Sequence, residues 1–237
     1  MASPLGPWPA KEPARRRLSV DSIVAAGLEI LAAEGADAVT MRAVAGKLGT
    51  GAASLYAHVR DKGELHALLL DAVIGEVDVP EADPARWREQ IKQFCWGQYR
   101  AMVRHPGIAA VSLAHIPTGP NALRCSEGML AILTAGGLSK LVAGLAVDLL
   151  TQYTTAVAYE DTLWWVRAED GNDPFASEGS VVAQAKAYFA GLPPAEYPMI
   201  TSMVEELTTG DGDARFQFGL DMIVAGLDNL RDWRLPG

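Results

Sequence analysis

The stretch TMRAVAGKLGTGAASLYAHVRDKGEL, residues 40–65, decides the fold of this chain. Apolar residues recur at helical spacing on both sides of a glycine-containing turn at residues 49–51, which predicts two short helices joined by that turn. Thr40 is the expected N-cap of the first helix, and the second is expected from Ala52 to about Val59, with Leu55 and Val59 buried. Two short helices joined in this way form a helix-turn-helix, whose second helix can enter the major groove of DNA.

Helical patterns continue on both sides of this stretch. Apolar positions between Val20 and Leu31 predict a helix with Ser19 as its N-cap and Gly35 as its stop. Residues 61–64 predict a capping box that opens a longer connecting helix, expected at residues 64–76. The expected buried face of that helix consists of Leu65, Leu68, Leu69, Ala72 and Val73.

The rest of the chain also has helical periodicity, and no alternating strand pattern appears after residue 80. A loop is expected at residues 171–180 from its Gly, Pro, Asn and Ser content. The expected helices cover residues 87–104, 121–135, 139–169, 181–190, 195–207 and 214–233. The fold class is therefore all-α, with an N-terminal three-helix unit, a connecting helix and a larger helical domain.

The charge of the chain is unevenly distributed. The 237 residues carry a formal net charge of −9, but residues 1–66 hold eight Lys/Arg against seven Asp/Glu, a net of +1. An acidic total does not exclude nucleic acid when a basic face is local. We expect a disordered basic arm at residues 1–17, a helix-turn-helix domain at 18–66, and a ligand-binding and dimerisation domain at 67–237.

Cysteine usage and apolar run lengths set the expected compartment. Cys95 and Cys125 lie in helical apolar patterns without metal-ligand spacing, so buried free thiols in a reducing cytosol are expected. The apolar run LVAGLAVDLL, residues 141–150, contains Asp148 and is expected to be too short to span a bilayer. These features predict a cytoplasmic protein with no membrane association.

Three interpretations compete for the quoted stretch. A nucleotide loop would need its Gly49-x-Gly51 to follow a strand, and here it follows an amphipathic helix. A plain surface turn is the second interpretation. In the third, the stretch reads DNA: small residues 52–54 let a helix enter the groove, and Arg42 can contact guanine with two hydrogen bonds. Thr40, Ser54, Tyr56, His58 and Lys62 would then reach phosphates or base edges.

The segment Leu55-Tyr56-x-His58-Val59-x-x-Lys62 resembles the DNA-binding region of the tetracycline-repressor (TetR) family, and the similarity begins near Ser19. The resemblance implies that the DNA-contacting positions are Thr40, Arg42, Ala52, Ala53, Ser54, Tyr56, His58 and Lys62. Tetracycline repressors have Gln and Pro where Ala52 and Ala53 stand, so a different operator is expected. The triplet at residues 15–17 either reaches a DNA groove or is a solvated basic tail, and the sequence favours neither.

Residues 105–118 and 218–230 are similar to the pocket segment and the final helix of the tetracycline repressors themselves. The resemblance and the aromatic content of this half imply a mostly apolar ligand site. Its expected residues are Trp87, Phe94, Gln98, Ser112, His115, Ile116, Met129, Tyr153, Glu160 and Trp164. Ser112 stands where the family has a histidine for drug-bound magnesium. The inducer is therefore not expected to be a magnesium–tetracycline complex, and no metal site or cofactor is expected.

The resemblance implies that the helices expected at residues 139–169 and 214–233 pair with those of a second copy as a four-helix bundle, and an apolar stripe on the last helix supports this pairing. The members of this stripe are Phe216, Leu220, Ile223, Val224 and Leu227. We therefore expect a homodimeric repressor that binds a pseudo-palindromic operator and is released by a small molecule. By analogy it controls an antibiotic-resistance gene. An activator of the same fold remains open. So does a small-molecule-binding protein or enzyme with a degenerate DNA-binding domain, although no GxSxG, HExxH or P-loop motif and no catalytic residue is found.

Overall fold

A computed structural model describes residues 18–169, 178–231 and 233–234, with the side chains of 164–169 and 178–181 outside the description. The described part of the chain is all-α, as predicted. Its helices are α1 (Val20–Glu34), the short 3₁₀ helix η1 (Ala36–Ala38), α2 (Met41–Lys47), α3 (Ala52–Leu55), α4 (Lys62–Ile74), α5 (Trp87–Arg104), α6 (Ile108–Ala114), α7 (Pro120–Ala135), α8 (Lys140–Glu169), α9 (Glu178–Ala190), α10 (Pro198–Ser202), α11 (Val204–Leu207) and α12 (Gly212–Asn229).

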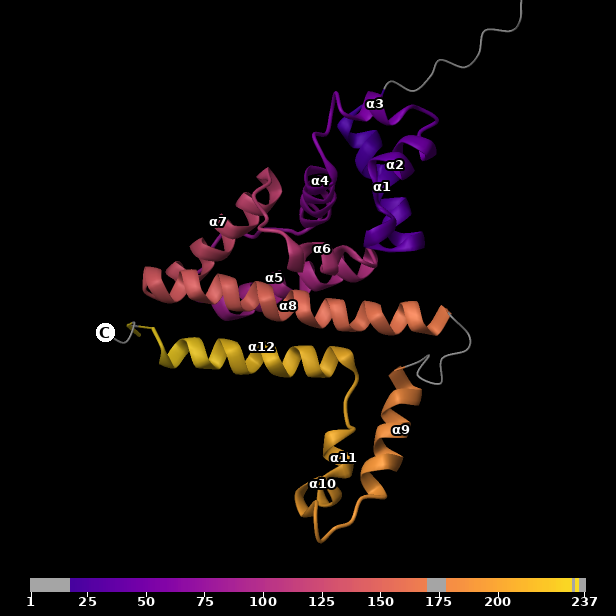
Figure 1. Ribbon diagram of the computed structural model, residues 1–237. Helices are drawn as coiled ribbons and strands as arrows, with labels where there is room; N and C mark the ends of the chain where they lie inside the picture. Colours follow the sequence, from indigo (N-terminus) through magenta and orange to yellow (C-terminus); the bar gives the residue numbers. More distant parts are fainter. Residues whose placement is uncertain (1–17, 170–177, 232, 235–237) are drawn as a thin grey trace, which may run out of the picture.

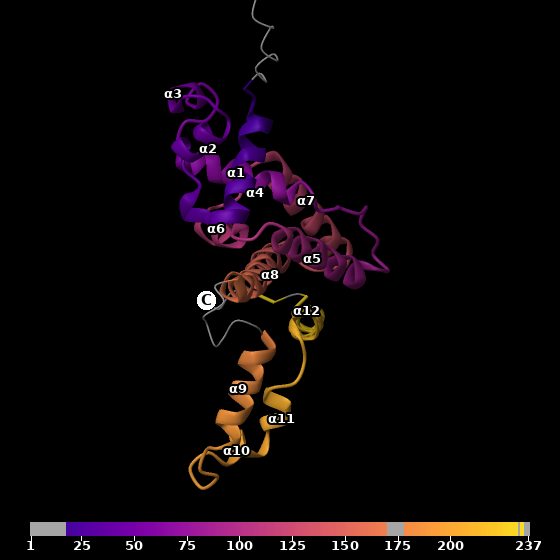
Figure 2. The ribbon, with the colours of Figure 1, turned by 90° about the vertical axis from the view of Figure 1, so that its right-hand side faces the viewer.

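The helices form three regions along one direction. Helices α1 to α3 lie at one end, α9 to α11 at the other, and α5 to α8 with α12 between them (Figures 1 and 2). Helix α4 contacts α1 on one side and α5, α6 and α7 on the other. It is therefore the main connection between the N-terminal unit and the larger helical region, to which a smaller contact between η1 and α6 is added.

The predicted N-caps of the first, second and fourth helices are confirmed. Ser19 and Ser22 form a reciprocal capping box, the Thr40 hydroxyl accepts the Ala43 N–H at 3.1 Å, and Asp61 accepts the Glu64 N–H at 2.8 Å. The expected capping box at residue 61 is wrong in one respect. Glu64 accepts its return bond at 2.5 Å from the N–H of Arg60, whose side chain it also pairs with, and not from the N-cap residue.

The third helix is shorter than predicted. It ends at Leu55 and not near Val59, because the chain tightens at once: the N–H of His58 bonds to the carbonyl of Leu55 at 2.8 Å. The predicted anchors nevertheless hold, since Leu55 and Val59 are both fully buried. Residues 56–58 therefore form an exposed turn between two buried anchors.

The buried face of α4 is broader than predicted and rotated. Leu68 and Ala72 are only half-buried, and the buried positions are Leu65, His66, Leu69, Leu70, Val73 and Ile74. The reason is that α4 is covered on two sides, by α1 and by α6 and α7, so positions next to the expected stripe are also enclosed.

Several later boundaries differ from the sequence prediction. The expected helix at 195–207 is two short helices, α10 and α11, separated at Met203. Helix α9 begins earlier than expected, at Glu178, and α12 covers Gly212–Asn229 instead of residues 214–233. The expected basic arm at residues 1–17 and most of the loop predicted at 171–180 lie outside the described residues. The domain boundaries at residues 17 and 66 stay predictions.

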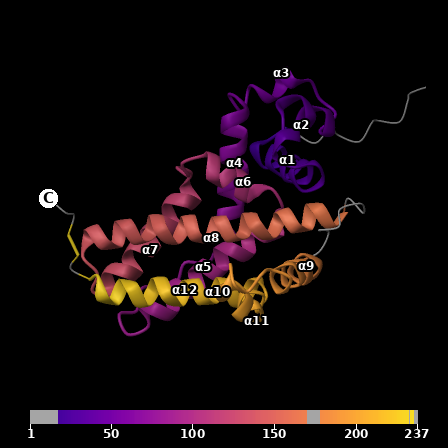
Figure 3. The ribbon, with the colours of Figure 1, turned by 60° about the horizontal axis from the view of Figure 1, so that its bottom comes forward.

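The predicted dimer stripe on α12 packs inside the chain instead. Phe216, Leu220, Val224 and Leu227 are buried against the rest of the same molecule, where α12 runs beside α8 (Figures 1 and 3). The C-terminal end of α12 is fixed by Asp228, which accepts two hydrogen bonds of 2.6 Å from Arg88 on α5. These bonds, with that from Arg231, lower the pKa of Asp228 to about 2.

Helix α8 corrects the expectation about apolar run length. Its segment Lys140–Leu163 is long and apolar enough to cross a membrane, by length and composition only. The short run predicted from the sequence extends because Asp148 does not end the helix. One face of α8 packs against α5, α6, α7 and α12, and its Thr154, Thr155 and Thr162 are buried. This packing makes α8 the central helix of the larger region.

Candidate nucleic-acid interface and ligand cavity

The residues expected to contact DNA lie on and around α3, at the end of the molecule farthest from α9–α11 (Figures 1 and 2). Tyr56 has 57% of its surface exposed although it is a large aromatic residue. Thr40 and Ala52 are half-buried, and the exposed positions are Arg42, Ala53, Ser54, Tyr56, His58 and Lys62. Leu55 and Val59 hold this surface to the core, so its outward side chains are available to a partner.

Two basic side chains on this surface differ in how they are held. The ammonium group of Lys62 lies 3.4 Å from the carbonyl oxygen of Asp37, which ties the start of α4 to the segment before α2. Arg42 is exposed in the first turn of α2, and no described residue forms an ion pair with it. A free guanidinium at this position can make the bidentate contact to guanine that the sequence predicts.

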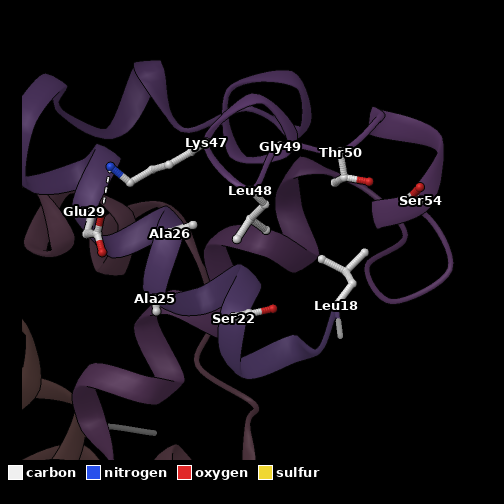
Figure 4. Close-up of a pocket in the computed structure, with 10 residues that line it drawn as sticks. All are labelled: Leu18, Ser22, Ala25, Ala26, Glu29, Lys47, Leu48, Gly49, Thr50 and Ser54. Atoms are coloured by element: carbon white, nitrogen blue, oxygen red, sulfur yellow. Dashed lines mark ion pairs between the residues drawn. The ribbon is translucent and has the colours of Figure 1, made fainter. Parts of the chain in front are cut away.

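A groove of about 650 Å³ separates the start of α1 from the turn between α2 and α3 (Figure 4). Its lining consists of Leu18, Ser22, Ala25, Ala26, Glu29, Lys47, Leu48, Gly49, Thr50 and Ser54. Lys47 and Glu29 close one end through an ion pair of 2.7 Å (Figure 4). Ser54 is the one lining residue predicted as a DNA contact. The sequence does not predict this groove, because the width of the groove depends on the distance between α1 and the turn in the folded chain.

A second cavity, of about 300 Å³, lies among α4, α5, α7 and α8. Four of the predicted ligand residues line it: Phe94, Gln98, Ile116 and Met129. The lining residues that are not among the predicted ligand residues are Ile74, Val77, Pro117, Ala122, Cys125, Ser126, Gly144, Val147, Asp148 and Thr151. Residues 122, 125, 126 and 129 on α7, and 144, 147, 148 and 151 on α8, are each spaced as one helix face. That spacing is the signal that could have identified them.

Other predicted ligand residues do not line this cavity. Trp87 is buried at the first position of α5. Its ring lies so close to Gly136 that a Cβ on residue 136 would clash with the ring. Tyr153 stacks on Phe216 at 5.5 Å, and its hydroxyl lies 3.2 Å from the carbonyl oxygen of Phe216. These two aromatic residues hold helices together, which is the ordinary role of buried rings.

The predicted polar ligand residues other than Gln98 also lie outside this lining. Glu160 is exposed on α8 and Ser112 is half-buried on α6, both outside the lining. The side chain of Trp164 is outside the description. His115 lines a small neighbouring space beside α4, together with Ile116 and Pro117. The described residues contain no group of three or more His, Cys, Asp or Glu placed to hold a metal ion.

The two cysteines are buried and free, as predicted. Cys125 lines the cavity, while Cys95 is fully buried on α5. Burial raises the pKa of the Cys95 thiol to about 12, and it also raises the pKa of Cys125. Both thiols are therefore protonated and poorly reactive at neutral pH.

Asp71 on α4 connects that helix to the cavity. Its carboxylate accepts the backbone N–H of Ala122 at 3.0 Å and the side-chain amide of Asn121 at 3.1 Å, both in the first turn of α7. Gly119 permits this approach, because a Cβ at that position would fall 2.2 Å from the carboxylate oxygen. Since Ala122 also lines the cavity, only Ala122 lies between the Asp71 carboxylate and a molecule bound in the cavity.

A pair of histidines lies beside this connection. The Nε2 atom of His66 on α4 is 3.3 Å from the carbonyl oxygen of Val39, immediately before α2. The His66 ring also meets the ring of His115 edge-on at 5.7 Å. Burial lowers the pKa of His66, the bond to the Val39 carbonyl opposes this shift, the charges of Lys62 and His115 add to it, and Asp37 also opposes it.

The lowered pKa of His66 predicts a loss of stability in mild acid. Because the unfolded chain takes up the proton near pH 6.5 and the folded one at lower pH, the free energy of unfolding should fall as pH drops below 6.5. One proton contributes at most about 1.4 kcal/mol per pH unit. Urea unfolding at pH 7.5, 6.5 and 5.5 should show a smaller loss for His66→Gln than for the unmodified chain. His58→Gln, at an exposed position, is the control. Equal losses in all three proteins would contradict the assignment.

The chain is similar to known proteins in both sequence and structure. Residues 23–68 match the family described as bacterial regulatory proteins, tetR family, and residues 79–231 match the tetracyclin repressor-like C-terminal domain. An HTH-type transcriptional regulator of Saccharopolyspora erythraea is 33% identical over 213 residues, with 89% of this chain and 84% of the relative covered. The HTH-type transcriptional repressor DrrR1 of Streptomyces coeruleorubidus is 31% identical, with 95% and 82% covered.

Solved structures agree with the sequence matches. The Streptomyces coelicolor TetR family protein ActR in complex with actinorhodin is 36% identical. It superposes with a TM-score of 0.82, covering 92% of this chain and 99% of that chain. The names of the two sequence relatives describe a regulator and a repressor of transcription.

Proposed function

Because this chain belongs to the tetR family of bacterial regulatory proteins, we propose that it is a repressor that a small, largely apolar molecule releases from its operator. One observation carries the proposal: α4 joins an exposed DNA-facing surface around α3 to a cavity among α4, α5, α7 and α8. We propose that the eight positions predicted from the sequence to contact DNA form that surface. The protein is proposed to act in the cytoplasm, to catalyse no reaction and not to associate with a membrane.

The operator-bound form is proposed to be a homodimer. Helices α8 and α12 each expose apolar residues on the side away from the core: Leu141, Leu145 and Leu149 on α8, and Phe218 and Met222 on α12. Beyond the backbone of its own helix and its two chain neighbours, a Cβ placed on Gly226 would meet no described atom within 4 Å, so a partner helix could approach there. Two-fold pairing would place two copies of α3 in successive major grooves, roughly 34–36 Å apart on a pseudo-palindromic site.

The cavity is proposed to bind the inducer. The name of the DrrR1 relative supports a repressor, and the solved complex of ActR with actinorhodin supports a small-molecule ligand in this type of fold. The lining contains no histidine and a single carboxylate, that of Asp148, so a magnesium–tetracycline complex is not the proposed inducer. Ligand and DNA would each weaken binding of the other, typically by about 1–3 kcal/mol.

Gel shift with the DNA upstream of the protein's own gene tests the proposal. The unmodified chain should bind one site specifically, and Arg42→Ala should weaken that binding by about 1–3 kcal/mol and relax specificity at one base pair. Arg86→Ala removes the same charge at an exposed position in the other half and should bind like the unmodified chain. Equal affinities of all three proteins for specific and random DNA would refute a sequence-specific regulator.

A further inference from the structure

The side-chain oxygen of Gln98 is buried in the wall of the ligand cavity and has no hydrogen-bond partner among the described residues. Gln98 lies on α5, one helical turn after Phe94, and has 8% of its surface exposed. Its Oε1 atom is fully enclosed, and no described donor reaches it. Buried side-chain oxygens are hydrogen-bonded in the large majority of cases, so an unpaired one needs a physical explanation.

The described neighbours of Gln98 do not supply the missing donor. The lining is mainly apolar, with Ile74, Phe94 and Met129 from three helices and Val77 from the segment after α4. The Cys125 thiol is directed to the carbonyl oxygen of Ile74 at 3.8 Å. Asp148 is an acceptor already bonded to the side-chain amide of Gln152. The hydroxyls of Ser126 and Thr151 also line the cavity, but neither forms a hydrogen bond with the Gln98 oxygen. A molecule bound in the cavity can supply the missing donor.

We propose that Gln98 sets the specificity of the cavity by accepting a hydrogen bond from a hydroxyl group on a neutral, apolar ring compound. This inference rests on the proposed function, because it names the ligand class of the same cavity. The ring is favoured by the Phe94 side chain, by Pro117, and by Gly144, which leaves that part of the wall without a side chain. An anion is disfavoured because the described lining contains Asp148 but no Lys or Arg, and an uncharged ring suits a mainly apolar wall in which any charge would lose its hydration.

The cavity sets an upper limit on the ligand. About 300 Å³ lies at the lower end of the range of roughly 300–1,000 Å³ that small-molecule sites occupy. A fused two-ring compound is a suitable probe of this size class. A ring compound without the hydroxyl would fill the same space but leave the amide unpaired, which is how a polar site rejects a close analogue.

The test compares two probes of nearly equal shape, 2-naphthol and 2-methylnaphthalene, by equilibrium dialysis. The unmodified chain should bind 2-naphthol about tenfold more tightly, because only the hydroxyl pairs with Gln98. In Gln98→Leu that preference should disappear or reverse. Met129→Leu, in the same wall but without a polar group, should change both affinities alike and keep their ratio.

The ratio of the two affinities decides the result, because a general loosening of the cavity would weaken both probes together. An unchanged ratio in Gln98→Leu overturns the inference, as does failure of both probes to bind at millimolar concentration. Gel shift on the ligand-free proteins separates this from the proposed function. If the ratio changes as expected but no operator is bound, the specificity inference stands and the repressor proposal fails. If operator binding is normal and the ratio is constant, only the specificity inference fails.

Discussion

Met222→Glu is expected to convert the protein into a monomer and to lower its affinity for a full operator at least about 100-fold. Met222 is 61% exposed on α12, on the side opposite the buried Leu220 and Val224. In a two-fold interface each substitution occurs twice, and an uncompensated buried charge costs about 3–5 kcal/mol. Loss of pairing removes the gain of binding two half-sites at once, which is worth about 10²–10⁴ in affinity.

The measurement separates assembly from DNA contact. Sedimentation gives the mass in solution, and gel shift compares the full operator with a single half-site. Met222→Glu should lose full-operator affinity and keep half-site affinity, because α3 is untouched. Leu123→Glu is the matched control, since Leu123 is 60% exposed but lies on α7. A Met222→Glu protein that stays dimeric at micromolar concentration would contradict the proposed interface.

The same helix shows what a sequence pattern can and cannot predict. The spacing of Phe216, Leu220, Val224 and Leu227 correctly predicts that one face of α12 is covered. The spacing does not show which surface covers that face, because an apolar stripe has the same period whether it is buried against the same chain or against a second copy. The second, shorter apolar row at Phe218 and Met222 is left exposed once the first is buried.

The helix-turn-helix could be predicted more fully than the cavity. Thr40 as N-cap, the buried pair Leu55 and Val59, and Asp61 as N-cap all depend on residues close in sequence, whose chemistry is local. The cavity depends on how α5, α7 and α8 pack at long range. Trp87 and Tyr153 were therefore expected in it because they are aromatic, although each is occupied elsewhere: Trp87 packs against Gly136 and Tyr153 stacks on Phe216.

Asp71→Ala is expected to abolish the response to inducer while operator binding without inducer remains. The carboxylate on α4 accepts hydrogen bonds from the first turn of α7, whose next turns form one wall of the cavity. Without it, a molecule that shifts α7 would no longer shift α4. The weakening of DNA binding by ligand, typically about 5–150-fold in coupled systems, should fall close to onefold.

The variant should also be less stable, which provides a second measurement. Removing a side chain that caps a helix costs about 0.5–2 kcal/mol, and one that accepts several bonds as a carboxylate lies toward the upper part of that range. For a chain of this size each kcal/mol lowers Tm by about 2–4 °C. Glu127→Ala, an exposed carboxylate on α7, should change neither Tm nor the response.

Asp71→Asn distinguishes a mechanical connection from simple destabilisation. Its remaining oxygen can still accept the Ala122 N–H, but its amide group would oppose the amide of Asn121, so one of the bonds is kept and another is lost. The ligand response should then fall between those of the unmodified chain and Asp71→Ala. If Asp71→Ala lowers Tm yet the inducer still releases DNA to the full extent, α4 and the cavity communicate by another route, and the contacts of His66 with Val39 and His115 become the next to test.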